Sequence, residues 1–285
     1  RLAAEQHCHP AIAAILINRG ITLPQYAEYY LNPCFQHLRS PFSMKDMDKA
    51  VSRIIRALRE NEKILIFGDY DVDGMTATAL LFEFLTHAGA NVDYHIPDRL
   101  TEGYGLNAQA VIHHATTNQT NLIITVDCGI TSHEAVDTAN AQGIDVVITD
   151  HHEPPDRLPS AHAIVDPKRT DCPSRLRALA GVGVAFNLAL ALRKRLRDNG
   201  FWNNGRQEPN LKAACDLVAL GTVADMVPLL RENRIYVKAG LEVLTTAPRP
   251  GLQALIEVSG LSGRTLDTRD LAFRLAPRLN AAGRL

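Results

Sequence analysis

Residues 63–80 read KILIFGDYDVDGMTATAL, and the interpretation of the whole chain starts from this stretch. A short apolar run ends in three aspartates spaced two apart, Asp69, Asp71 and Asp73, and Gly74 follows at once. In an extended segment alternate side chains point the same way, so three negative charges would crowd onto one face. Proteins tolerate such crowding mainly by binding cations. The stretch therefore predicts a cation site at the end of a buried strand, with a solvated acidic loop as the alternative.

The same spacing matches the first six positions of the calcium-binding loop D-x-D-x-D-G-x5-E. The glutamate that this loop requires falls on Leu80, and an apolar strand precedes the acids where a calcium loop has a helix. A calcium loop is therefore excluded, and further ligands must come from elsewhere in the chain.

The composition describes an ordinary globular chain. With 285 residues, 46% hydrophobic, it is long enough for one large domain or two unequal ones. No apolar run approaches the length of a membrane span and no signal or transit sequence is visible, so no membrane partner is expected. The five cysteines are scattered without a C-x-x-C pair, which favours reduced thiols and a cytoplasmic location over disulfides or a zinc site. The start at Arg1 indicates a trimmed chain.

Charge is distributed unevenly along the chain. The formal net charge of −1 argues against a protein coated in positive charge. Residues 168–197, however, contain eight Lys and Arg and a single acid, Asp171. A local nucleic-acid groove is therefore permitted, although arginines at 193–197 also suit a merely solvated helix face.

From residue 63 the hydrophobic pattern alternates between strand and helix, which predicts an α/β fold with a mostly parallel sheet flanked by helices. Strands are expected at 63–68, 91–97, 121–127, 145–150 and 162–167, and helices at 75–88, 106–115 and 132–142. Helices are also expected before this region, at 10–19, 24–31 and 46–61, and after it, at 179–200, 234–245 and 251–258. In helix 46–61, Met47, Val51 and Ile54 form the buried face while Arg53 and Arg56 are expected to face away.

Two further strands end in residues that bind metals. LIITV stops at Asp127, and DVVIT stops at Asp150, His151 and His152. A single aspartate at a strand end is more often a helix cap, but three such ends at one edge of a parallel sheet favour a site. Asp225 follows an apolar helix in a segment with almost no other polar residue, and an isolated acid there needs a partner.

The collected candidates suffice for two divalent cations that share one carboxylate: Asp69, Asp71, Asp73, Asp127, Asp150, His151, His152 and Asp225. Carboxylates with one or two imidazoles suit Mn²⁺ or Mg²⁺, and the lack of thiolate ligands argues against structural zinc. Two such ions form a clamp for a phosphoester, with arginines holding its outer oxygens.

Three smaller expectations concern other polar positions. Gly181 and Gly183 are expected just before a helix, where their N–H groups would receive a phosphate or merely form a tight turn. His113 and His114 are expected at the surface of a helix, and Asp166 is expected to cap or turn the chain.

Five ordered motifs carry a resemblance to the DHH phosphoesterase superfamily: GDYDVDG (68–74), VDCGI (126–130), DHH (150–152), GTVADMVPL (221–229) and PRLNAAGR (277–284). The stretches EGYGLN (102–107) and LAGVGVAF (179–186) are similar to its branch of single-strand-specific exonucleases. The resemblance runs from residue 64 to the end. It implies a DHH fold, two Mn²⁺ or Mg²⁺ ions and 5′-to-3′ exonuclease action on single-stranded DNA in repair and recombination.

The resemblance also implies roles for single residues. Asp71 would ligate one ion, Asp73, His151 and Asp225 the other, and Asp127 would bridge the two. Many members carry a histidine where this chain has Phe67, so Asp69 or water would fill that place. His152, Arg278 and Arg284 would contact phosphates with help from Asn280, Tyr104 would stack on the strand, and Asp150 would orient His151.

The resemblance implies a division of the chain. Residues 1–62 would be an N-terminal helical segment packed on the core, and 63–285 a DHH catalytic domain, α/β to 167 and helical from 168. Members carry a further DHHA1-type domain, and the exonucleases an OB-type barrel, so a catalytic-core fragment is expected. The expected partner is single-stranded DNA, followed by single-strand-binding protein and a helicase, on a monomer. The alternatives are a phosphodiesterase for short oligonucleotides, cyclic dinucleotides or polyphosphate, and a non-catalytic replication scaffold.

Overall fold

A five-stranded parallel sheet lies at the centre of the computed structural model, which describes residues 1–203 and 205–282. The strands are β1 (Ile64–Phe67), β2 (Val92–His95), β3 (Leu122–Val126), β4 (Asp145–Thr149) and β5 (Ala163–Val165). They lie in the order β2-β1-β3-β4-β5, with every neighbouring pair parallel. The strand order reverses at β1, so β1 and β3 are neighbours, and α/β sheets bind ligands beyond the strand ends at such a point. The predicted α/β class is confirmed.

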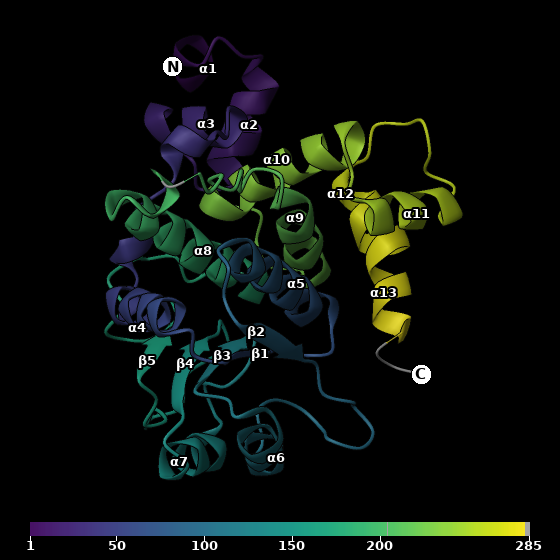
Figure 1. Cartoon of the computed structure of the whole chain (residues 1–285). Helices are drawn as coiled ribbons and strands as arrows, with labels where there is room; N and C mark the ends of the chain where they lie inside the picture. The colour runs from purple at the N-terminus through teal and green to yellow at the C-terminus, as the bar shows by residue number, and fades with distance from the viewer. Residues whose placement is uncertain (204, 283–285) are drawn as a thin grey trace.

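Helices cover both faces of the sheet (Figure 1). One face packs on α4 (Met47–Glu60), α5 (Val72–His87) and α8 (Gly181–Asp198), and the other on α6 (Ala108–Asn118) and α7 (His133–Ala141). Strand β1 shows why: Ile64 and Ile66 belong to the first core, and Leu65 and Phe67 to the second. A strand buried on both faces is apolar throughout, as the sequence of β1 is.

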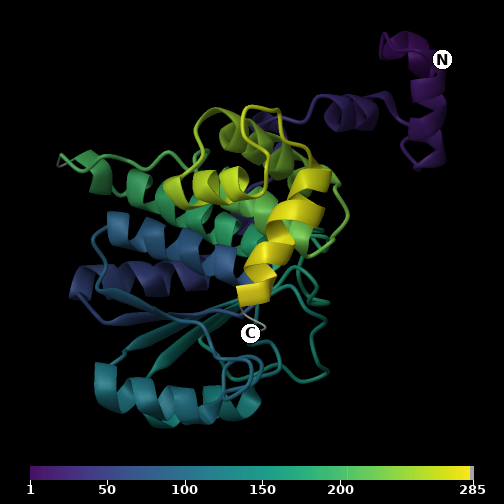
Figure 2. The same cartoon turned by 90° about the vertical axis from the view of Figure 1, so that its right-hand side faces the viewer.

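The C-terminal part adds a helical layer beyond α5 and α8. It comprises α9 (Cys215–Ala224), α10 (Arg231–Thr246), α11 (Pro250–Val258), α12 (Thr268–Asp270), the π-helical turn η4 (Leu271–Leu275) and α13 (Ala276–Ala282). In Figure 2, η4 and α13 form one continuous yellow helix that descends beside α5 towards the sheet. The side chain of Asn280 reaches the start of α5, where its Oδ1 accepts the N–H of Val72 at 3.1 Å.

The N-terminal helices α1 (Leu2–Glu5), α2 (Pro10–Asn18) and α3 (Pro24–Leu31) project from the body of the molecule (Figure 2). Leu2, Ala13, Leu16 and Ala27 form a small core of their own. The chain returns to the main body through the short 3₁₀ turns η1 (Phe35–His37) and η2 (Pro41–Ser43); a third, η3 (Phe201–Asn203), follows α8. Among the described residues, no helix is both long and apolar enough to span a membrane.

Three expectations from the sequence are wrong in detail. Arg53 does not face away: it is 4% exposed and forms ion pairs with Asp145 and Glu62 across the base of the sheet. His114 is not a surface residue, because it is buried against β2, whereas its neighbour His113 is exposed. Helix α5 begins at Val72, three residues earlier than expected, for a reason given below.

Candidate metal centre

The loop after β1 turns directly into helix α5. Asp71 is the N-cap of this helix, and its Oδ1 accepts the N–H of Gly74 at 3.0 Å. This bond satisfies one of the free N–H groups of the first turn and starts the helix at Val72. A Cβ on Gly74 would lie 2.6 Å from the backbone N and O of Asp69, so only glycine allows the loop to close this tightly. Asp73 consequently lies in the first turn and points inward.

Asp73 is held by the start of another helix. Its Oδ2 accepts the N–H of Gly181 at 2.6 Å, and its Oδ1 accepts the N–H of Val182 at 2.9 Å. Since the N-terminus of a helix favours a negative group, α8 fixes this carboxylate in place. Of the two alternatives left open for Gly181 and Gly183, a phosphate site and a tight turn before the helix, neither is observed, because both glycines belong to α8 and the N–H groups of Gly181 and Val182 bind a carboxylate of the chain itself.

Asp127 follows β3 in a strained backbone conformation. Its φ of +62° is uncommon for a residue other than glycine, and such outliers concentrate at functional sites. The side chain is 2% exposed, and a Cβ on Gly181 would lie 2.4 Å from its Oδ1. The close packing of α8 against Asp127 thus depends on the missing side chain of Gly181.

His151, after β4, points one ring nitrogen at these acids. Its Nδ1 lies 3.1 Å from the carbonyl oxygen of Leu179, which can only accept, so Nδ1 carries the proton. Its Nε2 then offers a lone pair, 3.1 Å from Asp127 Oδ1, 3.7 Å from Asp225 Oδ2 and 3.8 Å from Asp73 Oδ2. Hydrogen bonding of the far nitrogen to a carbonyl is the usual arrangement of a metal-binding histidine.

Three atoms at this point are buried without a hydrogen-bond partner among the described residues: Asp127 Oδ1, His151 Nε2 and Asp225 Oδ2. All three are acceptors that face one another. Leaving a buried polar atom unpaired costs about 1–3 kcal/mol, and more for a charge. A cation between them removes this cost, so the donor set fits a metal ion.

The pKa values show the same crowding. Burial, then repulsion from neighbouring acids, raises the pKa of Asp73 and of Asp127 well above the ordinary carboxyl range. Burial also raises the pKa of Asp225, and it raises that of Asp69 to about 6. Because carboxylates this close resist being ionised together, binding of divalent cations is the means of keeping all of them charged.

The possible ligand atoms form overlapping groups, each within 4.8 Å. One group contains Asp69, Asp71 and Asp127, another Asp73, His151 and Asp225, and a third Asp127, His151 and His152. The first two groups are the candidates for two separate cation sites, and Asp127, a member of the first, lies 3.1 Å from His151 of the second. Phe67 takes no part, because it is fully buried with its ring stacked on that of His95, centroid to centroid 5.0 Å.

Asp150 holds His152, not the ring of His151 as predicted. Its Oδ1 accepts the Nδ1–H of His152 at 2.7 Å, and its Oδ2 accepts the N–H of Ile130 at 2.9 Å. Burial alone would raise the pKa of Asp150, but these bonds outweigh it and the pKa lies below its usual value. The same bond raises the pKa of His152, whose side chain remains 46% exposed. His152 thus presents one edge of its ring to solvent beside the acids, in surroundings that favour its protonated form.

An open cleft of about 480 Å³ adjoins the acids. It is lined by Asp69, Tyr70, Asp71, Arg99, Tyr104, Gly129, Ile130, Thr131, Asp150 and His152. The Tyr104 hydroxyl donates to the Asp127 carbonyl at 3.5 Å, and its ring stands edge-on to that of His152 at 6.2 Å. Arg99 lies over the ring of Tyr70, at 5.6 Å.

Three residues that line this cleft were not among the predicted site residues: Arg99, Tyr70 and Thr131. Tyr70 sits between two of the aspartates, and its position was a usable signal. Arg99 comes from an exposed loop after β2 whose path no local pattern predicts.

The two described C-terminal candidates, Arg278 and Asn280, do not line this cleft. Asn280 is engaged with the N–H of Val72, at the start of α5. Arg278 is exposed, and its guanidinium donates to the carbonyl of Arg274 one turn earlier. Arg284 lies outside the described residues.

The basic segment 168–197 does not form one continuous groove, and that expectation is wrong for its second half. Arg193 lies twelve residues beyond Gly181, about 18 Å along α8 at 1.5 Å per residue. There Arg193 and Arg197 pair with Glu208, and Arg195 pairs with Asp48.

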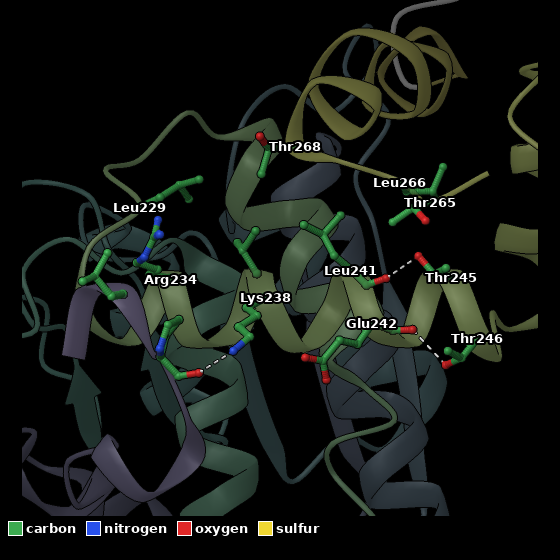
Figure 3. Close-up of a pocket in the computed structure, with 13 residues that line it drawn as sticks. Leu229, Arg234, Lys238, Leu241, Glu242, Thr245, Thr246, Thr265, Leu266 and Thr268 are labelled. Carbon is green, nitrogen blue, oxygen red and sulfur yellow. Dashed lines mark hydrogen bonds between the residues drawn. The ribbon is translucent and has the colours of Figure 1, made fainter. Parts of the chain in front are cut away.

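A larger pocket of about 550 Å³ lies along α10 and contains no comparable cluster (Figure 3). Leu229, Val237 and Leu241 supply much of its lining. Its basic side chains are engaged: Arg234 donates to the Tyr30 carbonyl at 2.6 Å, and Lys238 lies 3.4 Å from the Pro33 carbonyl. This pocket lies where the N-terminal helices and residues 265–268 meet α10, away from the acids at the sheet edge.

Comparisons with known proteins identify relatives of this chain. The single-stranded-DNA-specific exonuclease RecJ of Bacillus subtilis is 42% identical over 284 residues, 100% of this chain and 34% of the relative. RecJ of Dickeya dadantii is 49% identical over 240 residues, 83% of this chain and 42% of the relative. The crystal structure of Thermus thermophilus RecJ in complex with Mn²⁺ superposes with a TM-score of 0.80 at 33% identity, covering 99% of this chain and 38% of that one.

The chain thus spans about a third to two fifths of the length of these curated relatives. The family model described as "DHH family, N-terminal domain" matches residues 63–222, which include β1 to β5 and every acid of the cluster except Asp225. The resemblance stated from the motifs is confirmed, and this chain belongs to the DHH family.

Proposed function

We propose that the chain is the catalytic part of a metal-dependent exonuclease that hydrolyses single-stranded DNA from its 5′ end. The observation that carries the proposal is the set of buried, mutually facing acceptors, Asp127 Oδ1, His151 Nε2 and Asp225 Oδ2, beside an open cleft. A structural site would be closed, whereas this one opens to a space large enough for a nucleotide. The family and the RecJ relatives supply the reaction class.

Two Mn²⁺ or Mg²⁺ ions fit the donor set, because oxygen ligands with a single imidazole suit these cations. Asp69 and Asp71 would hold one ion, Asp73, His151 and Asp225 the other, and Asp127 both. When bound, such a pair activates water and neutralises the charge that builds on a phosphodiester.

The residues of the chain position the substrate around that centre. His152, whose bond to Asp150 favours its protonated form, is placed to contact the phosphate that is cleaved. Arg99 and Tyr104 line the same cleft, where they would hold a neighbouring phosphate and stack on a base. The rigid support of Asp73 by α8 and of His151 by Leu179 keeps the ligands in place during turnover.

Other parts of the proposal rest on the relatives. Single-stranded DNA is the proposed substrate because the named relatives are single-stranded-DNA-specific exonucleases. Roles in repair and recombination, contact with single-strand-binding protein and a helicase, monomeric state and phosphate contacts by Arg278 and Arg284 stay predictions. The division of the chain at residue 63 also stays a prediction. A cytoplasmic location stays a prediction too, and the free cysteines support it.

A direct test compares four substrates on chelated protein to which Mn²⁺ is returned. The substrates are a single DNA strand with a 5′ label, the same sequence as duplex, a short RNA and a cyclic dinucleotide. The proposal predicts that the single strand is hydrolysed at least about tenfold faster than each of the other three substrates. Preference for the cyclic dinucleotide or RNA would contradict the substrate, and metal binding without any hydrolysis would favour a scaffold.

A further inference from the structure

The loop 98–105 beyond β2 is tied to the body of the protein by a row of polar side chains. His95, the last residue of β2, places its Nε2 2.8 Å from Oε2 of Glu102 in the loop. Its Nδ1 lies 3.2 Å from Nε2 of His114, and the Nδ1 of His114 lies 3.0 Å from the amide nitrogen of Asn118. The row therefore runs from helix α6 to the loop.

The protons in this row have one consistent arrangement. The Glu102 carboxylate can only accept, so the Nε2 of His95 carries its proton. The Nδ1 of His95 then accepts from His114, whose own Nδ1 accepts from the Asn118 amide. Burial, and then the neighbouring His95, lower the pKa of His114, which agrees with a neutral ring. Bonds that all point the same way strengthen one another, and here they end on a carboxylate.

Glu102 connects the row to the loop by hydrogen bonds. Its Oε1 accepts the N–H of Asp98 at 3.0 Å, and its own N–H donates to the Asp98 carbonyl at 2.8 Å. Asp98 Oδ1 in turn accepts the N–H groups of Leu100 and Thr101. The loop is otherwise exposed, Leu100 to 79%, so few apolar contacts hold it.

An inner member of the row, His95, is anchored close to the candidate metal ligands. The ring of His95 stacks on Phe67, which ends β1 two residues before Asp69. Phe67 itself is fully buried. Through His95, the loop is thus connected to β1, the strand that leads into Asp69 and Asp71. The row therefore fixes the position of the loop relative to the candidate metal centre.

We propose that the row Asn118, His114, His95 and Glu102 positions the loop 98–105 and thereby holds Arg99 and Tyr104 in place for the substrate. This inference rests on the proposed function. None of the four residues lines the cleft, so they are positioning residues. A loop already held in its binding position loses less entropy when the strand arrives, which lowers KM without changing the reaction itself.

The test uses His95→Phe, which keeps a ring against Phe67 and removes the two hydrogen bonds that His95 makes in the row, to Glu102 and to His114. Glu102→Gln is the milder change, because its amide oxygen retains one of the two bonds that the carboxylate accepts. His113→Phe is the matched control, since His113 lies on the exposed face of α6, next to His114 of the row. The measurements are KM and kcat on single-stranded DNA with Mn²⁺, Mn²⁺ affinity, and hydrogen exchange of the loop amides.

The expected result for His95→Phe is a KM about tenfold higher, with kcat and Mn²⁺ affinity within about twofold of the wild type. Exchange at Leu100 and Thr101 should accelerate, Glu102→Gln should fall between, and His113→Phe should match the wild type. In Arg99→Ala, adding His95→Phe should raise KM by less than in the wild type, because the part of its effect that acts through Arg99 is already lost.

Two outcomes would overturn the inference: unchanged loop exchange in His95→Phe, or faster exchange with an unchanged KM. A fall in kcat together with Mn²⁺ affinity would also contradict it, because the row would then support the centre and not the loop. Failure of the proposed function is separate. It appears as a wild type that hydrolyses no single strand, while the exchange comparison still decides whether the row holds the loop.

Discussion

The Nε2 atom of His151 lies 3.1 Å from Oδ1 of Asp127, and both are buried acceptors without a donor in the part of the chain that the structure describes. Two strands, β4 and β3, bring them there from residues 24 apart in sequence. Their contact is unfavourable unless a cation lies between them or a proton is shared. The proposed metal centre depends on this contact between His151 and Asp127.

The first prediction concerns the pH dependence of stability in chelated protein. Asp73 and Asp127 have raised pKa values, and Asp69 a pKa of about 6, so the folded state holds their protons more tightly than the unfolded state. Their contribution is fully present below the unfolded carboxyl pKa of 3.8 and is lost as pH rises through 6 and above. Since one pKa unit corresponds to about 1.4 kcal/mol, unfolding free energy should fall by at least about 1 kcal/mol between pH 5 and 8.

Urea unfolding at a series of pH values measures this slope. Saturating Mn²⁺ should remove most of it, because the bound ions replace the protons. A chelated protein that gains stability over the same range would contradict the raised pKa values.

The second prediction concerns Gly181. In Gly181→Ala the new Cβ meets Asp127 Oδ1 at 2.4 Å, so the carboxylate or the helix must move. Mn²⁺ affinity should fall at least about tenfold, and stability by about 1–3 kcal/mol. Gly183→Ala is the matched control, because its Cβ meets only the Leu179 side chain, at 3.2 Å. Calorimetry with Mn²⁺ checks both variants, and equal affinities would argue against the close approach of α8 to the centre.

The third prediction concerns Arg99 as a phosphate contact. Binding of a phosphorothioate-protected single strand should weaken in Arg99→Ala, and the slope of log K against log salt should shrink by about 0.7. Arg59→Ala is the control, since Arg59 is exposed near the end of α4 that leads into β1, at the opposite edge of the sheet. An unchanged slope in Arg99→Ala would show that Arg99 contacts no phosphate.

The fourth prediction concerns His152. The bond to Asp150 raises the pKa of His152, so its positive charge is kept below that pKa and is lost as pH rises through it. Asp150→Asn removes the negative partner and should move the high-pH fall in 1/KM to lower pH. The pH profile of KM on single-stranded DNA measures the shift. The same profile in both proteins would exclude a charged His152 as a substrate contact.

Much of the fold follows from local patterns in the sequence. Apolar runs of four or five residues alternating with helical periods predict a parallel sheet, and all five strands lie where they were expected. The start of α5 was misplaced because the capping role of Asp71 was hidden by its metal-like spacing. The burial of Arg53 was missed because its partner Asp145 is 92 residues away, and helical periodicity describes only the helix itself.

The site was predictable in composition and less so in geometry. Strand ends bring Asp69, Asp127 and His151 to one edge, as parallel pairing requires, and Asp73 follows in the first turn of α5. The support of these residues was not predictable, since no local rule places Leu179 and the start of α8 at Gly181 beside the ends of β3 and β4. The exchange of roles in which Asp150 holds His152 and Leu179 holds His151 depends on side-chain angles that only the three-dimensional structure shows.

The most direct test of the central claim is calorimetric titration of the chelated chain with Mn²⁺. The account predicts two ions per chain for the wild type and for Asp137→Asn, a control on the exposed face of α7. Asp127→Asn, which keeps the shape of the side chain and halves its capacity to bridge, should bind Mn²⁺ at least about tenfold more weakly and lose hydrolysis. Wild-type protein that binds no Mn²⁺, or Asp127→Asn that binds two ions with unchanged affinity, would contradict the metal centre.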